Sequence, residues 1–135
     1  MERPGERIGG STMTETASAP VKAQVSFEDF QKLDLRVATV TAAEPHPNAD
    51  RLLLIQLDDG TGSPRQVCAG IRAWYEPQAL LGRQVVIVAN LAPRTIRGRE
   101  SRGMIRAVVA RDDDGAEDVV LLAPDRPIAA GSPVS

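Results

Sequence analysis

Apolar and polar side chains alternate in short runs along most of the chain, and a period of two residues is typical of a half-buried β-strand. Turns rich in proline and glycine separate these runs. The pattern predicts six short strands, at residues 33–40, 51–57, 65–69, 83–89, 101–110 and 118–122. Residues 90–98 contain Pro93 and are predicted to form a loop.

A short helix is predicted before the first strand. Ser26 and Asp29 have the spacing of a capping box, in which side chains satisfy the free amide groups at a helix start. The helix is expected to be about two turns long. It would place Phe27, Phe30 and Leu33 on one face.

A second short helix is predicted at residues 76–81, because Gly82 follows it as a C-terminal cap. Three strands, a helix and two more strands form the plan of the five-stranded oligonucleotide-binding (OB) barrel, a Greek-key fold. We therefore predict an all-β, five-stranded OB barrel with short helices. A C-terminal extension over residues 111–135 is expected to follow it.

A chain of 135 residues is expected to form one domain. Residues 1–24 are rich in Gly, Ser, Thr, Ala and Pro and show no apolar periodicity. We therefore expect a disordered tail at residues 1–24 and an ordered domain at residues 25–135. Met13 is followed by Thr-Glu-Thr-Ala, an ordinary beginning for a protein, and we expect translation to start there.

The formal net charge of −2 conceals a segregation of charge along the chain. Residues 65–106 contain eight arginines against Glu76 and Glu100, whereas the segments on either side are acidic. One interpretation is a local positive surface that attracts an anionic partner. The other is that arginine is simply the surface cation of this protein, which has only two lysines.

Several kinds of chemistry are excluded by the residues present. Cys68 is the only cysteine, which rules out an internal disulfide and fits a reducing cytoplasm. His46 is the only histidine and lies between two prolines, where we interpret it as a turn-forming residue. The sequence therefore supplies neither a catalytic triad nor a zinc site, and it has no phosphate-binding glycine motif. We expect a cytoplasmic protein that is not an enzyme, binds no cofactor or metal, and does not enter a membrane.

Two stretches carry a more specific signal. The first is Pro-His-Pro-Asn-Ala-Asp-Arg-Leu at residues 45–52. The second begins with Asn-Leu-Ala-Pro-Arg at residues 90–94 and continues to Ser-Arg-Gly-Met at residues 101–104. Together they resemble the tRNA-binding domain appended to bacterial methionyl-tRNA synthetases. The same domain occurs in a free-standing tRNA-binding protein and in the EMAP-II cytokine precursor. The resemblance covers residues 25–134.

This resemblance implies a barrel that binds tRNA without reading an anticodon, either free-standing or as an accessory to an aminoacyl-tRNA synthetase. It also implies a homodimer, paired through the N-terminal helix and the C-terminal segment. Many relatives carry a lysine where this chain has Ala92, and we expect Arg94 to compensate. The candidate RNA-binding residues are Arg36, Asn48, Arg51, Asn90, Arg94, Arg97, Arg99, Ser101 and Arg102.

The chemistry of these residues suits a nucleic acid, because arginine pairs with phosphate through two hydrogen bonds. Asn90 and Ser101 are equally interpreted as contacts to ribose or bases and as turn-forming residues at strand ends. For Asn48 we favour a structural role in the loop that orients Arg51. Aromatic residues make up only 3% of the chain, so base stacking is a poor explanation and recognition of folded RNA a better one.

Three other functions compete with tRNA binding. The first is an export-associated chaperone of the CsaA type, which resembles the same domain and would bind unfolded polypeptide. We rank it second because such relatives are expected to lack an extension over residues 111–135. The others are a general single-stranded DNA binder, which the shortage of aromatic residues disfavours, and a purely structural dimer or adaptor.

Overall fold

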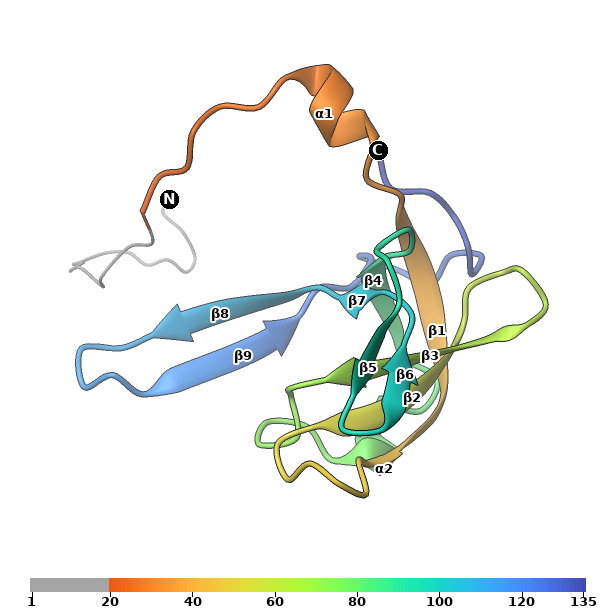
Figure 1. Ribbon diagram of the computed structural model, residues 1–135, viewed down its shortest axis with the longest axis vertical. Helices are drawn as coiled ribbons and strands as arrows, with labels where there is room; N and C mark the ends of the chain where they lie inside the picture. The colour runs from red at the N-terminus through yellow and green to blue at the C-terminus, as the bar shows by residue number, and fades with distance from the viewer. Residues whose placement is uncertain (1–19) are drawn as a thin grey trace.

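The computed structural model describes residues 20–135 and contains one curved sheet, two β-hairpins and two short helices (Figure 1). The predicted tail at residues 1–24 falls mostly outside the described residues, as does Met13. The helices are α1 (Phe27–Gln31) and α2 (Pro77–Leu80). The strands are β1 (Leu35–Pro45), β2 (Leu53–Asp58), β3 (Pro64–Ala69), β4 (Gln84–Val88), β5 (Arg94–Ile96), β6 (Arg99–Ser101), β7 (Met104–Ile105), β8 (Ala107–Arg111) and β9 (Glu117–Leu121).

The main sheet has the order β3-β2-β1-β4-β7, and every neighbouring pair is antiparallel. The long strand β1 pairs with β4 along its first half and with β2 along its second half. A bulge between Val40 and Ala42 bends β1 where its partner changes. The two outer strands then approach each other, because the Arg102 amide donates to the Gln66 carbonyl at 2.8 Å. The result is the predicted nearly closed, OB-like barrel.

The barrel interior is filled by aliphatic side chains. Leu53, Ile55 and Leu57 lie at every second position along β2, and all three are fully buried. Val67 and Ile87 are buried with them, on β3 and β4. The period of two therefore predicted these strands because one face of each must leave water.

Two strand predictions around the arginine-rich segment are wrong. Residues 90–98 were expected to be a loop, but β5 lies within them and pairs with β6. Residues 101–110 were expected to form one strand, but the chain is divided there into β6, β7 and β8. Gly103 causes the first break: its φ is +118°, and a Cβ atom at this position would lie 2.8 Å from the Val88 carbonyl oxygen. Only glycine allows the chain to turn this close to β4.

The chain after β7 forms a hairpin, and the C-terminal extension then returns to the barrel. Strands β8 and β9 pair only with each other in a ribbon that projects from the barrel (Figure 1). The chain then runs back along the first residues of β1, where the Val37 amide donates to the Ser132 carbonyl at 3.0 Å and the Val134 amide to Leu35 at 2.8 Å. This segment satisfies backbone groups of β1 that β2 does not reach.

The helix α1 begins as predicted but is shorter than the two turns expected. The Ser26 hydroxyl accepts a hydrogen bond from the Asp29 amide at 3.0 Å, so the predicted N-cap is confirmed. The helix has only five residues, and none of them is buried. Phe27 and Phe30 are 71% and 45% exposed, which leaves an apolar surface outside the barrel. Among the described residues, none of the helices is long and apolar enough to cross a membrane.

Candidate nucleic-acid interface

The β5–β6 hairpin carries three of the predicted RNA-binding arginines. Its two strands are joined by the pair Arg97-Gly98, whose φ values are +51° and +86°. Positive φ at both positions is the geometry of the tight turn that matches the natural twist of a hairpin. Arg97 is the one non-glycine residue with positive φ in the part of the chain that the structure describes. The turn therefore holds an arginine in a backbone conformation that such a side chain disfavours.

The pairing register of the hairpin sorts its side chains between two faces. Arg94 lies opposite Ser101, and Ile96 lies opposite Arg99, so these four residues share one face. Burial raises the pKa of the Cys68 thiol on β3, and the charges of Arg94 and Arg99 oppose this shift. Ser101 on this face accepts a hydrogen bond from the Cys68 amide at 2.9 Å, so this side of the hairpin faces β3.

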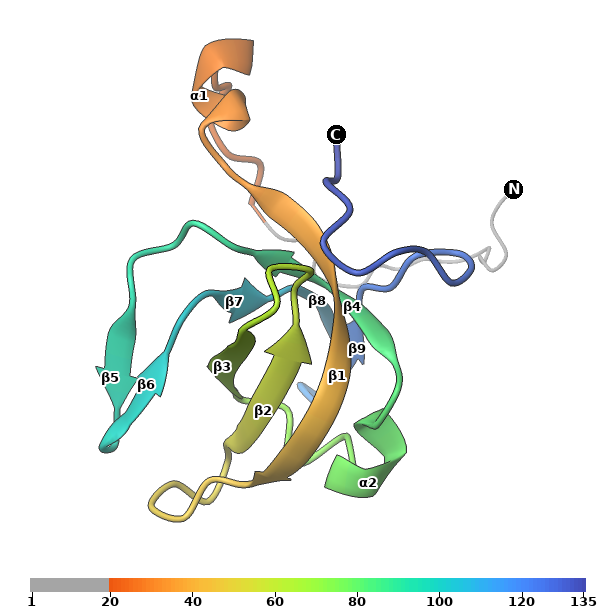
Figure 2. The ribbon, with the colours of Figure 1, turned by 90° about the vertical axis from the view of Figure 1, so that its right-hand side faces the viewer.

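The β1–β2 loop, residues 46–52, lies against the tip of this hairpin (Figure 2). His46 Nε2 is 2.9 Å from the Ile96 carbonyl oxygen, and the Asn48 side chain donates to the Arg97 carbonyl oxygen at 3.1 Å. His46 is only 3% exposed, and its Nδ1 accepts from the Asn48 amide, so its predicted role in shaping the loop is confirmed. The loop and the hairpin thus form one continuous surface.

This surface, which we call the candidate interface, consists of residues 46–52 and the β5–β6 hairpin. It gathers exposed arginines from two distant parts of the sequence, Arg51 on the loop and Arg94, Arg97 and Arg99 on the hairpin. Within residues 20–135, none of these four side chains forms a salt bridge. The four arginines are therefore not held in ion pairs, and they outnumber the two carboxylates of the same loop and hairpin, Asp50 and Glu100, which suits an anionic ligand.

Arg72 is an exposed cation beside this surface that the sequence reasoning did not select. Its guanidinium donates to the Asp50 carbonyl oxygen at 3.2 Å, which places it next to the β1–β2 loop. The only sequence signal for Arg72 was its membership of the basic segment, and that signal is shared by seven other arginines.

Two predicted contact residues are used inside the protein instead. Ser101 is 1% exposed, and its hydroxyl accepts from the Cys68 amide at 2.9 Å, so it fastens the base of the hairpin to β3. Of the two interpretations of Ser101, this burial favours the structural role over a contact to ribose or bases. Asn90 is exposed, but its side chain accepts from the Asp34 amide at 2.9 Å and donates to the Lys32 carbonyl at 2.6 Å. Asn90 therefore ties the start of β1 to the end of β4.

Two further predicted arginines lie outside the candidate interface. The Arg36 side chain on β1 bonds both carboxylate oxygens of Asp34, at 2.9 and 3.0 Å, and this hydrogen bonding raises the pKa of Arg36. Arg102 follows the hairpin and lines a cleft of about 140 Å³ together with Asp59 and Arg65. The structure thus brings together Asn48, Arg51, Arg94, Arg97 and Arg99, and it separates Arg36 and Arg102 from them.

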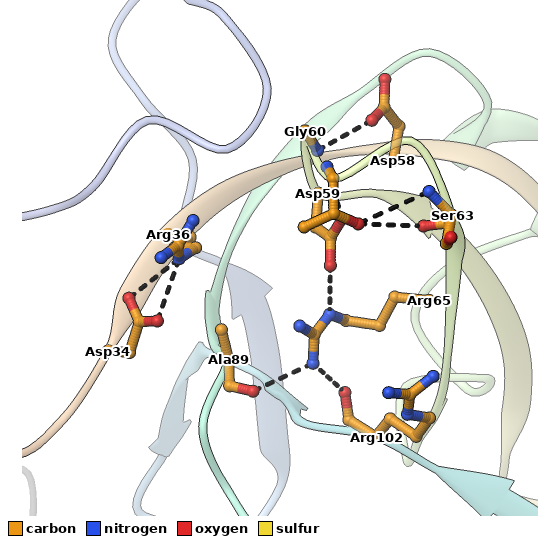
Figure 3. A network of polar contacts seen from close by, with 10 residues as sticks. Asp34, Arg36, Asp58, Asp59, Gly60, Ser63, Arg65, Ala89 and Arg102 are labelled. Atoms are coloured by element: carbon orange, nitrogen blue, oxygen red, sulfur yellow. Dashed lines mark hydrogen bonds and ion pairs between the residues drawn. The ribbon is translucent and has the colours of Figure 1, made fainter.

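Arg65 forms a half-buried polar network that the sequence reasoning also missed (Figure 3). It donates to the Asp59 carboxylate at 2.8 Å and to the carbonyl oxygens of Ala89 and Arg102 at 3.0 and 2.6 Å. Both side chains are largely removed from water, with 17% of Arg65 and 4% of Asp59 exposed. Arg65 therefore links the β2–β3 turn, the end of β4 and the chain after the hairpin.

The Asp59 carboxylate predicts a loss of stability in acid. Burial alone would raise the pKa of Asp59, but hydrogen bonds from Thr61 and Arg65 outweigh it and leave this pKa below its ordinary value. The group therefore contributes stability that is complete above about pH 4 and is lost as the pH falls through the lowered pKa. The unfolding free energy of wild type should fall more steeply below about pH 4 than that of Asp59→Asn. Identical acid profiles in denaturant titrations would contradict this role.

Comparison with known proteins identifies related domains. The sequence model described as "Putative tRNA binding domain" matches residues 35–133. A methionine–tRNA ligase of Pyrococcus furiosus is 47% identical over 110 residues, which are 82% of this chain but 14% of that protein. The chain thus spans about a seventh of the length of this curated relative.

Two solved structures share the fold over their whole length. The chaperone CsaA of Bacillus anthracis superposes with a TM-score of 0.72 and 36% identity, covering 84% of this chain and 100% of that one. A MetRS related protein of Pyrococcus horikoshii gives a TM-score of 0.72 at 27% identity, with the same coverage. The family match over residues 35–133 and the identity to the ligase show that this chain belongs to the tRNA-binding domain family.

Proposed function

We propose that this chain binds folded tRNA through the candidate interface and catalyses no reaction itself. The observation that carries the proposal is the set of four exposed arginines, Arg51, Arg94, Arg97 and Arg99, gathered on the paired loop and hairpin without carboxylate partners among the described residues. Guanidinium groups at fixed positions contact phosphates of an RNA backbone and supply affinity that does not depend on base identity.

The aromatic residues support recognition of RNA shape rather than base stacking. Trp74 and Tyr75 pack against the hydrophobic core, and their polar atoms bond Glu117 and Leu121. Phe27 and Phe30 lie on α1, outside the barrel. Among the described residues, none of these four rings lies on the candidate interface, so it lacks the stacking platform that single-strand binders use.

We further propose that the chain is a homodimer in the cytoplasm and serves as a free-standing or accessory factor for an aminoacyl-tRNA synthetase. The apolar surface at α1 supports the dimer, because Phe27, Phe30 and Leu33 remain 71%, 45% and 49% exposed. Val134 of the C-terminal segment, whose amide donates to the Leu35 carbonyl at the start of β1, is also 39% exposed.

The dimer predicts a solution mass of about twice the 14.4 kDa of one chain. Replacing Phe27 and Phe30 together by Ser should shift the protein to monomer, because two large apolar side chains would leave the interface. Light scattering measures both masses. A wild-type mass of 14.4 kDa would contradict the dimer. An unchanged dimer in the double variant would place the interface elsewhere.

Binding of unfolded polypeptide is the second candidate function, favoured by the 36% identity to a chaperone over that protein's whole length. Length does not separate the two candidates, contrary to the sequence-based expectation. The alignment with the chaperone covers 84% of this chain. Residues 1–110 are a smaller share of the 135 residues, so the alignment must include part of the C-terminal extension.

The two candidates are distinguished by titrating the same protein with labelled tRNA and with a labelled, permanently unfolded polypeptide, followed by fluorescence anisotropy. We expect saturable binding to tRNA that weakens as salt is raised, and no binding to the polypeptide at the same protein concentrations. Binding to the polypeptide alone would favour the chaperone function and reject tRNA binding.

A further inference from the structure

The side chains of His46 and Asn48 hold the tip of the hairpin at two adjacent points. Asn48 donates its backbone amide to His46 Nδ1 at 3.0 Å, so Nδ1 must be the unprotonated nitrogen of the ring. The proton is then on Nε2, which donates to the Ile96 carbonyl oxygen at 2.9 Å. The Asn48 amide side chain completes the arrangement by donating to the Arg97 carbonyl oxygen at 3.1 Å. We call these three hydrogen bonds the His46–Asn48 latch.

The latch is not required to attach the hairpin to the barrel, because the base of the hairpin has its own anchors on β3. Ser101 accepts from the Cys68 amide, and the Gln66 side chain donates to the Glu100 carbonyl at 2.9 Å. The tip is different. Arg97 is exposed there, and the observed turn gives it a positive φ, which a non-glycine residue disfavours. A two-stranded hairpin is only marginally stable by itself, so its tip would move without the latch.

The latch also fixes the distance between cations that come from different segments. Arg51 follows Asn48 on the same loop, and Arg97 occupies the turn that Asn48 holds. The backbone at this exposed turn is strained and is held by hydrogen bonds from a neighbouring loop rather than by the core, which points to a functional constraint. Cations that are held in place before binding lose less entropy when they bind than mobile ones.

We propose that His46 and Asn48 are positioning residues for tRNA binding: the latch holds the Arg97 turn in the orientation that lets its guanidinium contact a phosphate at the same time as Arg51 and Arg94. Neither latch residue needs to touch RNA. This inference rests on the proposed tRNA-binding function, and it assigns to the only histidine of the chain a role in that function.

A double-mutant cycle between Asn48→Ala and Arg97→Ala tests the proposal, with tRNA affinity as the readout. Asn48→Ala should weaken binding about fivefold in the wild-type background, the scale of one hydrogen bond. In the Arg97→Ala background the same change should alter affinity by less than about twofold, because the side chain that the latch positions is already gone. Asn48→Ala should also make the salt dependence of binding shallower.

The matched control is Gln78→Ala, which removes an exposed amide side chain on α2 and should leave affinity unchanged. Denaturant titration of each variant confirms that it is folded under the binding conditions. His46→Gln, which retains a side-chain donor for the Ile96 carbonyl, should bind more tightly than His46→Ala.

The outcomes separate the positioning claim from the proposed function. If wild type does not bind tRNA, the function itself fails. If wild type binds and Arg97→Ala weakens binding, but Asn48→Ala has no effect or the same effect in both backgrounds, the latch is merely structural and the positioning claim is overturned.

Discussion

Replacing Arg65 by Met is expected to lower the free energy of unfolding by about 3–5 kcal/mol, because it leaves the Asp59 carboxylate buried without its charge partner. The same change removes the donors to the Ala89 and Arg102 carbonyl oxygens, so three segments lose their common link (Figure 3). Surface ion pairs have far smaller effects, and the difference here comes from the removal of both side chains from water.

Urea titration followed by circular dichroism measures this loss. The double variant Asp59→Asn with Arg65→Met should recover part of the stability, because it replaces the uncompensated charge by a neutral amide. Arg65→Lys should lie between wild type and Arg65→Met, since a lysine keeps the charge but cannot donate in three directions with the same planar geometry. A loss below about 1 kcal/mol in Arg65→Met would show that the network contributes little.

Replacing Arg94 and Arg97 together by Ala is expected to weaken tRNA binding by about 1–3 kcal/mol for each lost charged contact. The two side chains lie on the β5–β6 hairpin, are exposed, and form no salt bridge within the described residues, so their removal should leave the fold intact. Each lost phosphate contact should also reduce the salt dependence of binding by about one unit of slope.

Arg126→Ala is the matched control, because Arg126 is an exposed arginine in the segment after β9, outside the candidate interface. It removes the same charge and should change affinity much less. If the double variant binds tRNA with the affinity and salt slope of wild type, the RNA contacts a different surface. Equal losses in the control and the double variant would mean that only net charge matters.

The barrel strands were predictable because burial imposes their pattern. Leu53, Ile55 and Leu57 face the interior and lie at every second position, which leaves a visible period of two. The β5–β6 hairpin left no such pattern, because most of its residues are exposed on both faces. Gly98 was the one available signal for the hairpin, since glycine is favoured at the positive φ of a two-residue hairpin turn.

The roles of the polar residues near the hairpin could not be derived from their types. Ser101 and Asn90 were as suitable for RNA as for the fold, and the structure shows each of them bonded to backbone groups distant in sequence. Cys68 is the partner of Ser101 and Asp34 is a partner of Asn90, and each pair comes together only when the barrel folds. The exposure of Arg94, Arg97 and Arg99 was easier to predict, because clustered cations stay at the surface unless carboxylates pair with them.

The C-terminal return to β1 was also beyond sequence patterns. Residues 131–134 bond the backbone of β1 through Gly131, Ser132 and Val134 without forming a regular strand. Gly131 has a φ of +89°, and a Cβ atom there would lie 2.6 Å from the Asp59 carbonyl oxygen. This contact requires a glycine at position 131. Its partner, Asp59, lies in a turn more than half of the chain earlier, so no local sequence pattern indicates the contact.

Recognition of folded tRNA by arginines of the loop and the hairpin is tested by gel-shift titration of the wild-type protein. The nucleic acids are folded tRNA, unfolded tRNA and oligo-dT, each over a series of salt concentrations. We expect tight binding to folded tRNA alone, with the logarithm of the affinity falling linearly with the logarithm of salt concentration. Failure to bind any RNA at low salt, or equal binding to all three nucleic acids, would contradict it.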